Sequence, residues 1–110
     1  MENRLTRTVE RIRESPGLYI GQYSIFRLSW FLEGYVFALE EIDGAESERA
    51  LLRNLHFHIE RNHHCNVSQN WDNILWFVTG NERAALDAFW NIWDDIIKSD
   101  NGNEHLQNST

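Results

Sequence analysis

Large apolar residues recur every three or four positions along most of this sequence, which is the spacing that lets a helix bury one face. The clearest stretch begins at Glu82, just after a Thr79 or an Asn81 that can cap a helix. Its apolar face consists of Leu86, Phe89, Trp90, Trp93, Ile96 and Ile97. Alternating apolar and polar residues, the pattern of a strand, never continue over the length of a strand. The sequence therefore predicts an all-α protein.

Four further segments carry the same spacing and are bounded by residues that stop helices. Pro16 and Gly17 end the first segment, since proline disfavours helical geometry in the residue before it. The apolar stretch over residues 15–23 is expected to form a short turn. Gly44 and Gly80 end two later segments. We therefore expect an irregular bundle of five helices, at about residues 3–14, 24–42, 46–61, 71–79 and 82–98.

The second predicted helix, residues 24–42, is apolar over most of its circumference, as is usual for a helix contacted on several sides. Gly34 lies in its interior, where glycine costs about 1 kcal/mol relative to alanine. A close helix crossing at Gly34 would explain a small residue at this position. In the third predicted helix an apolar stripe runs from Leu51 to Ile59, and Glu48 is expected at the solvated end of this stripe.

A length of 110 residues, of which 42% are hydrophobic and 13% aromatic, is enough for one domain with its own core. We assign this domain to residues 1–98 and expect the polar residues 99–110 to form a flexible tail. Cys65 is the only cysteine, so no disulfide can form within the chain and a reducing compartment is favoured. The sequence lacks the apolar run of a signal peptide or of a membrane span. We therefore expect a cytoplasmic protein that does not enter a membrane.

The chain is strongly acidic, with 17 acidic residues against 10 basic ones and a formal net charge of −7. Phosphate backbones repel such a chain, so direct nucleic-acid binding is disfavoured and a basic protein partner is favoured. The acids concentrate in two clusters, one around the turn between the second and third predicted helices and one on the polar side of the last. We expect these acids to bind the partner: Glu40, Glu41, Asp43, Glu46 and Glu48, then Asp87, Asp94 and Asp95.

Four histidines and the cysteine gather in one segment, within ten residues: His56, His58, His63, His64 and Cys65. Zinc needs three or four ligands that converge on one point, and none of these spacings places two ligands on one helix face. Neighbouring loop residues also rarely supply both a thiol nucleophile and its base. We therefore expect no metal, no cofactor, no catalytic residue and no enzymatic activity. A small metal- or thiol-dependent enzyme centred on His63, His64 and Cys65 remains the alternative.

Residues 16–35 read PGLYIGQYSIFRLSWFLEGY. This segment resembles small bacterial proteins that carry Met-Tyr-Ile-Gly, then Ser and Leu, then Phe-Leu-x-Gly-Tyr, with Leu18 here in place of the methionine. Such proteins are encoded beside polymorphic toxins as immunity proteins, for example in contact-dependent growth inhibition systems. The resemblance implies a protein that neutralises a cognate toxin, often a basic nuclease, by covering its active site or an adjacent basic surface. A helical adaptor or a homodimer is a further alternative, and the sequence leaves the oligomeric state open.

Overall fold

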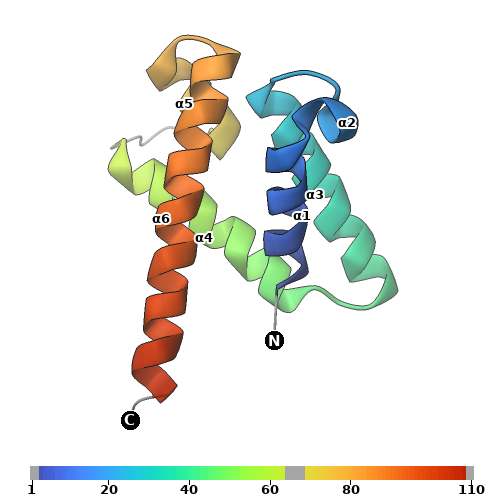
Figure 1. Cartoon of the computed structure of the whole chain (residues 1–110), viewed down its shortest axis with the longest axis vertical. Helices are drawn as coiled ribbons and strands as arrows, with labels where there is room; N and C mark the ends of the chain where they lie inside the picture. The colour runs from blue at the N-terminus through green and yellow to red at the C-terminus, as the bar shows by residue number, and fades with distance from the viewer. Residues whose placement is uncertain (1–2, 64–68, 109–110) are drawn as a thin grey trace.

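The computed structural model describes the backbone of residues 3–63 and 69–108, and the side chains of residues 3–63 and 69–99. Over these residues the chain forms helices and no strand, so the predicted all-α fold is confirmed. All five expected helices are present, and a short sixth one precedes the second of them. In chain order the helices are α1 (Arg4–Glu14), α2 (Pro16–Ile20), α3 (Ile25–Ile42), α4 (Glu46–Asn62), α5 (Trp71–Thr79) and α6 (Glu82–Asn108) (Figure 1).

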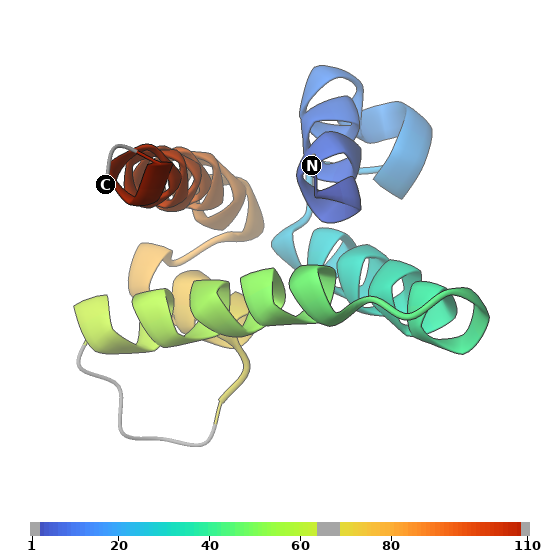
Figure 2. The ribbon, with the colours of Figure 1, turned by 90° about the horizontal axis from the view of Figure 1, so that it is seen from below.

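The helices form two layers. In Figure 1, α1 and α6 lie nearest the viewer, while α3 passes behind α1 and α4 passes behind α6. The view from below shows the same layers, with α1 and α6 on one side and α4 running across the other (Figure 2). The C-terminal turns of α6 extend past the other helices at one end of the molecule (Figure 1).

Side-chain caps set the starts of the long helices. Asn3 Oδ1 accepts hydrogen bonds from the backbone N–H groups of Leu5 and Thr6 at the start of α1. Ser24 caps α3 as its sequence position suggests. At α6 the cap is Asn81, whose Oδ1 accepts from Ala84 N at 2.8 Å. These caps satisfy N–H groups that have no partner within their own helix.

Two segments differ from the expected secondary structure. Residues 15–23 were expected to form a turn, yet five of them, Pro16–Ile20, form helix α2, because proline is well tolerated at the first position of a helix. Gly21 ends α2 with a φ of 78°, in the region that favours glycine. The last helix continues to Asn108 and so includes residues that we expected to form a separate tail. No proline interrupts the backbone there, and a single glycine is tolerated in a helix.

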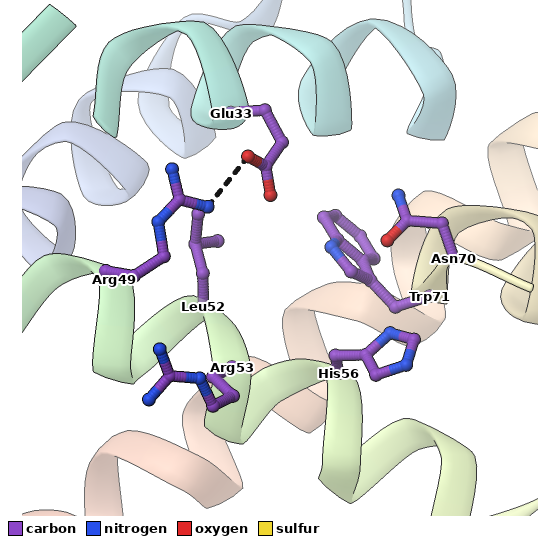
Figure 3. Close-up of a pocket in the computed structure, with 7 residues that line it drawn as sticks. All are labelled: Glu33, Arg49, Leu52, Arg53, His56, Asn70 and Trp71. Carbon is purple, nitrogen blue, oxygen red and sulfur yellow. Dashed lines mark hydrogen bonds and ion pairs between the residues drawn. The ribbon is translucent and has the colours of Figure 1, made fainter. Parts of the chain in front are cut away.

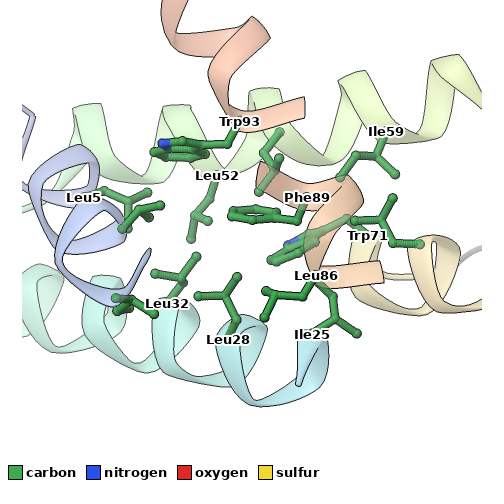
Figure 4. Packing of buried hydrophobic residues seen from close by; sticks show 14 of the residues in the cluster. Leu5, Ile25, Leu28, Leu32, Leu52, Ile59, Trp71, Leu86, Phe89 and Trp93 are labelled. Carbon is green, nitrogen blue, oxygen red and sulfur yellow. The ribbon is translucent and has the colours of Figure 1, made fainter. Parts of the chain in front are cut away.

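The core is built around stacked aromatic rings. Phe89 of α6 stacks against Trp71 of α5, with ring centroids 5.3 Å apart, and against Trp93 of its own helix at 5.8 Å (Figure 4). Trp90 meets the ring of Phe89 edge to face, at 5.1 Å. Aliphatic side chains from α1, α3, α4, α5 and α6 complete the core. They include Leu5, Val9, Ile12, Ile25, Leu28, Leu32, Val36, Leu52, Leu55, Ile59, Leu75 and Leu86.

Helix α3 contacts every other helix of the described chain, in agreement with its apolar character. Its contacts nevertheless leave one side uncovered, because Trp30 is 68% exposed and Phe37 is 60% exposed. Gly34 lies on this open side, and a Cβ atom added there would meet nothing within 4 Å. No helix among the described residues therefore crosses closely at Gly34, so a crossing within this part of the chain does not explain the glycine.

Candidate binding surfaces

The acids around the connection between α3 and α4 are tied to the first turn of α1. The guanidinium of Arg4 donates to Asp43 at 3.0 Å, to Glu48 at 3.2 Å and to the carbonyl oxygen of Gly44 at 2.8 Å. The backbone N–H of Arg4 also donates to Glu48, at 3.2 Å. Glu48 is only 3% exposed, so the prediction that it lies at the solvated end of its stripe is wrong.

Burial and hydrogen bonding act in opposite directions on the Glu48 carboxyl. Burial alone would raise its pKa, because a low-dielectric environment disfavours the charged form. The hydrogen bonds from Arg4 and from nearby backbone N–H groups outweigh this effect and hold the pKa of Glu48 below its ordinary value. The Glu48 carboxylate therefore serves to join α1 to α4 and is withdrawn from any partner surface.

A second arginine joins α3 to α4. Arg49 donates to both carboxylate oxygens of Glu40, at 3.2 and 2.9 Å, and to Glu33 at 2.9 Å. The hydrogen bonds from Arg49 lower the pKa of Glu40. Much of the negative charge of Glu40 is therefore neutralised within the chain.

One of the three predicted partner-binding acids of α6 is also paired with an arginine of another helix. Asp94 forms a bidentate ion pair with Arg13 of α1, whose Nη1 and Nη2 donate to its two carboxylate oxygens at 2.7 and 2.9 Å. These hydrogen bonds lower the pKa of Asp94. The Arg13 guanidinium also lies over the ring of Trp90, at 5.4 Å from its centroid. This pair joins the first helix to the last.

Four of the predicted partner-binding acids are exposed and make no ion pair with any residue whose side chain the structure describes. They lie on three different helices, and they are Glu41, Glu46, Asp87 and Asp95. Asp43 is exposed but paired with Arg4. The two predicted acidic clusters therefore each contribute part of their charge to the surface.

His56 and His58 each contact a polar side chain one turn further along α4. His56 Nε2 lies 3.2 Å from a carboxylate oxygen of Glu60, one turn along α4, and His58 Nε2 lies 3.0 Å from the side-chain amide of Asn62. No three His, Cys, Asp or Glu side chains are grouped to hold a metal ion in the part of the chain that the structure describes. Two members of the alternative site, His64 and Cys65, lie outside that part.

Two shallow recesses flank α4. One, of about 310 Å³, opens between α3, α4 and the start of α5, with Trp71 and Asn70 on one side and Arg49 on the other (Figure 3). Its acid, Glu33, is already paired with Arg49, and the lining carries no hydroxyl or thiol nucleophile. The other recess, of about 290 Å³, lies between α4 and α6 and includes Phe57 and Asp95.

Helix α5 presents an apolar surface to solvent. Trp76, Phe77 and Val78 follow one another in the chain and are 45%, 82% and 50% exposed. We call these three residues the α5 apolar surface. Phe26 of α3 adjoins it, with its ring centroid 6.1 Å from that of Trp76. The sequence analysis did not single out this surface, although a helix as short as α5 has too little area in contact with the core to bury apolar residues on every side.

The open side of α3 carries a second surface. Five of its positions follow the three-and-four spacing of one helix face, and we call them the α3 seam: Arg27, Trp30, Gly34, Phe37 and Glu41. All five are exposed. Arg27 donates one hydrogen bond to the carbonyl oxygen of Ile20, at 3.1 Å, which holds it beside the end of α2.

No helix of the described residues has the length and the hydrophobicity needed to cross a membrane. Comparison with protein-family models, with curated proteins and with solved structures found no match to this chain.

Proposed function

We propose that this protein binds another protein through the α5 apolar surface, and that the partner is a toxin that it neutralises. The observation that carries the proposal is the exposure of three consecutive large apolar residues, Trp76, Phe77 and Val78. Isolated apolar residues are common on protein surfaces, but a contiguous exposed group is a typical mark of a protein interface. Tryptophan in particular is enriched among the residues that dominate binding energy.

The charge of the chain supports a basic partner. The net charge is −7, and Glu46, Asp87 and Asp95 are exposed without an ion pair among the described side chains. Such charges attract a basic protein over a distance of about 10 Å at ordinary salt and raise the rate of encounter. In this proposal the acids speed association and the α5 apolar surface supplies most of the affinity.

The resemblance of residues 16–35 to immunity proteins supports a toxin as the partner. A toxin that acts on nucleic acid presents a basic substrate-binding surface, which an acidic protein can cover. Blocking by contact requires no catalytic group in the blocking protein, and the recess between α3, α4 and α5 is lined by no hydroxyl or thiol nucleophile.

The experiment is a binding titration of the purified chain with the product of the gene immediately upstream, which the proposal expects to carry a toxin domain. Phe77→Ala and Trp76→Ala should each weaken binding by roughly 30-fold, the effect of losing about 2 kcal/mol at an interface hot spot. Leu18→Ala is the matched control for Phe77→Ala, because Leu18 is exposed to a similar extent, 77% against 82%, but lies on α2. Equal affinity of wild type and both α5 variants, or no binding by the wild type, would contradict the proposal.

A second measurement tests the electrostatic part separately. Combined Glu46→Gln, Asp87→Asn and Asp95→Asn substitutions should lower the association rate several-fold at low salt and weaken its dependence on salt, with little change in the dissociation rate. An unchanged association rate would show that these acids do not steer the partner.

A further inference from the structure

We propose that the α3 seam is the site at which two copies of this chain pair, with their α3 helices antiparallel and crossing at Gly34. The proposal does not rest on the α5 apolar surface, with which the seam shares no residue, although Glu41 of the seam is also one of the acids expected to bind a partner. Its starting point is a conflict within α3. A glycine in the middle of a helix is destabilising, yet no described residue of the same chain lies close enough to Gly34 to require it.

The order of residues along the seam is complementary to itself. Arg27 lies seven positions before Gly34, and Glu41 lies seven positions after it. In an antiparallel pair that crosses at Gly34, residues equally far from the crossing meet. Arg27 of each copy then faces Glu41 of the other, which gives two ion pairs related by the twofold axis.

The apolar residues of the seam match in the same way. Trp30 lies four positions before Gly34 and Phe37 three positions after it, so each tryptophan comes within one residue of the phenylalanine of the other copy, an offset of about 1.5 Å along the helix. The missing side chain at Gly34 lets the two backbones approach at the crossing point, which brings these rings within reach of each other. Helices that cross on ordinary side chains are held about 8–10 Å apart.

The remaining acids near the seam do not oppose this pairing. Glu33 and Glu40 lie toward its α4 side, and both are paired with Arg49 of their own chain. Glu41 makes no ion pair with a side chain in the described ranges. A second copy of the chain necessarily presents a glutamate opposite Arg27 and an arginine opposite Glu41. An unrelated partner need not have this arrangement of charges.

The expected dimer is weak. Trp30 and Phe37 together expose roughly 300 Å² in each copy, or roughly 600 Å² in a pair. Stable specific interfaces bury about 1,200–2,000 Å² in total, so contacts beside the seam must supply the rest. We therefore expect a dimer that dissociates at concentrations on the order of 10 μM.

Complementary charge reversal tests the pairing. The wild-type chain should show a concentration-dependent dimer by sedimentation velocity. Arg27→Glu alone places two like-charged pairs in the interface, and so does Glu41→Arg alone, so each variant should dimerise at least tenfold more weakly. An equimolar mixture of the two variants should regain the dimer, because every facing pair is then opposite in charge, and the double variant should regain it alone.

The controls separate pairing from folding. Arg7→Glu and Glu14→Arg reverse exposed charges on α1 and should leave the dimer unchanged. Gly34→Leu should also prevent pairing while the far-UV circular dichroism of the single chain stays the same, because open space surrounds the added side chain. Recovery in the mixture cannot come from a misfolded variant.

Three results would overturn the proposal. One is a wild-type chain that stays monomeric up to roughly 0.5 mM, well above the expected dissociation constant. Another is a dimer that the single charge reversals do not weaken, or that mixing does not restore. The third is a monomeric wild type whose toxin binding is lost on Trp30→Ala, which would assign the seam to the toxin. Failure of Phe77→Ala to affect toxin binding would leave this pairing untouched.

Discussion

Phe89 lies among three indole rings, and its replacement tests how much of the stability of the fold comes from this cluster. The side chain is fully buried, and its ring is within 6 Å, centroid to centroid, of Trp71, Trp90 and Trp93. The contact with Trp71 joins α6 to the start of α5. Loosening it should therefore affect the helix that carries the α5 apolar surface.

Two substitutions at Phe89 separate volume from ring geometry. Phe89→Ala removes the whole ring and leaves a cavity, which costs about 3–5 kcal/mol in a well-packed core. Phe89→Leu keeps much of the volume but loses three aromatic pairs, each worth about 0.5–1.5 kcal/mol beyond its buried area. Aliphatic packing recovers part of this loss, so we expect about 1.5–3 kcal/mol for Phe89→Leu. Both changes are large against a total stability of about 5–15 kcal/mol.

Urea unfolding followed by far-UV circular dichroism measures these changes. With a slope of about 1–2 kcal/mol per molar urea, the midpoint should fall by about 1–2 M for Phe89→Leu and further for Phe89→Ala. Phe57→Leu is the matched control, since Phe57 is half exposed on α4 and should shift stability by less than about 0.5 kcal/mol. A Phe89→Leu variant as stable as the control would refute the role assigned to the ring contacts.

Three further predictions concern charge, backbone and metal. The pKa values of Glu48, Glu40 and Asp94 are lowered in the folded chain. Their contribution to the free energy of unfolding is therefore fully present above the unfolded pKa of about 4, and it is lost as pH falls through the folded pKa values. The urea midpoint should therefore drop at acid pH, and less steeply in Glu48→Gln; parallel curves for the two proteins would contradict this. Gly34→Ala should raise the melting temperature of the monomer at low concentration by several degrees, through a gain of about 0.5–1 kcal/mol in helix stability, and an unchanged or lower melting temperature would argue against an open site. Elemental analysis of the purified chain should find no stoichiometric zinc, since His56 and His58 are engaged by Glu60 and Asn62; one zinc per chain would restore the metal-site alternative.

The helices could be predicted from the sequence because their signals are local. Apolar spacing and the caps Asn81 and Ser24 act within one or two turns, so five helices were found and, apart from the C-terminal end of α6, their ends lie within a few residues of the predicted ones. The short helix α2 was missed because a proline such as Pro16 is compatible with two local structures. It ends the helix before it, and it also fits the first position of a new one.

The binding surfaces could be predicted only in part, because they depend on contacts between distant segments. Nothing near Glu48 in the sequence indicates that Arg4 covers it from 44 positions away. Gly34 indicated a close helix crossing, but the sequence could not say that the chain itself provides none. The exposure of Trp76 and Phe77 likewise depends on which side of α5 the other helices cover.

The ion pairs of α1 have a consequence for the order in which the chain can complete its fold during synthesis. Arg4 finds its carboxylates only after residues 43–48 have been made, and Arg13 waits for Asp94, 81 positions later. Helix α1 therefore gains its ion pair with α6 only after about half of α6 has been made. Until then α1 lacks this ion-pair partner, and the arginines on its polar faces keep these faces hydrated.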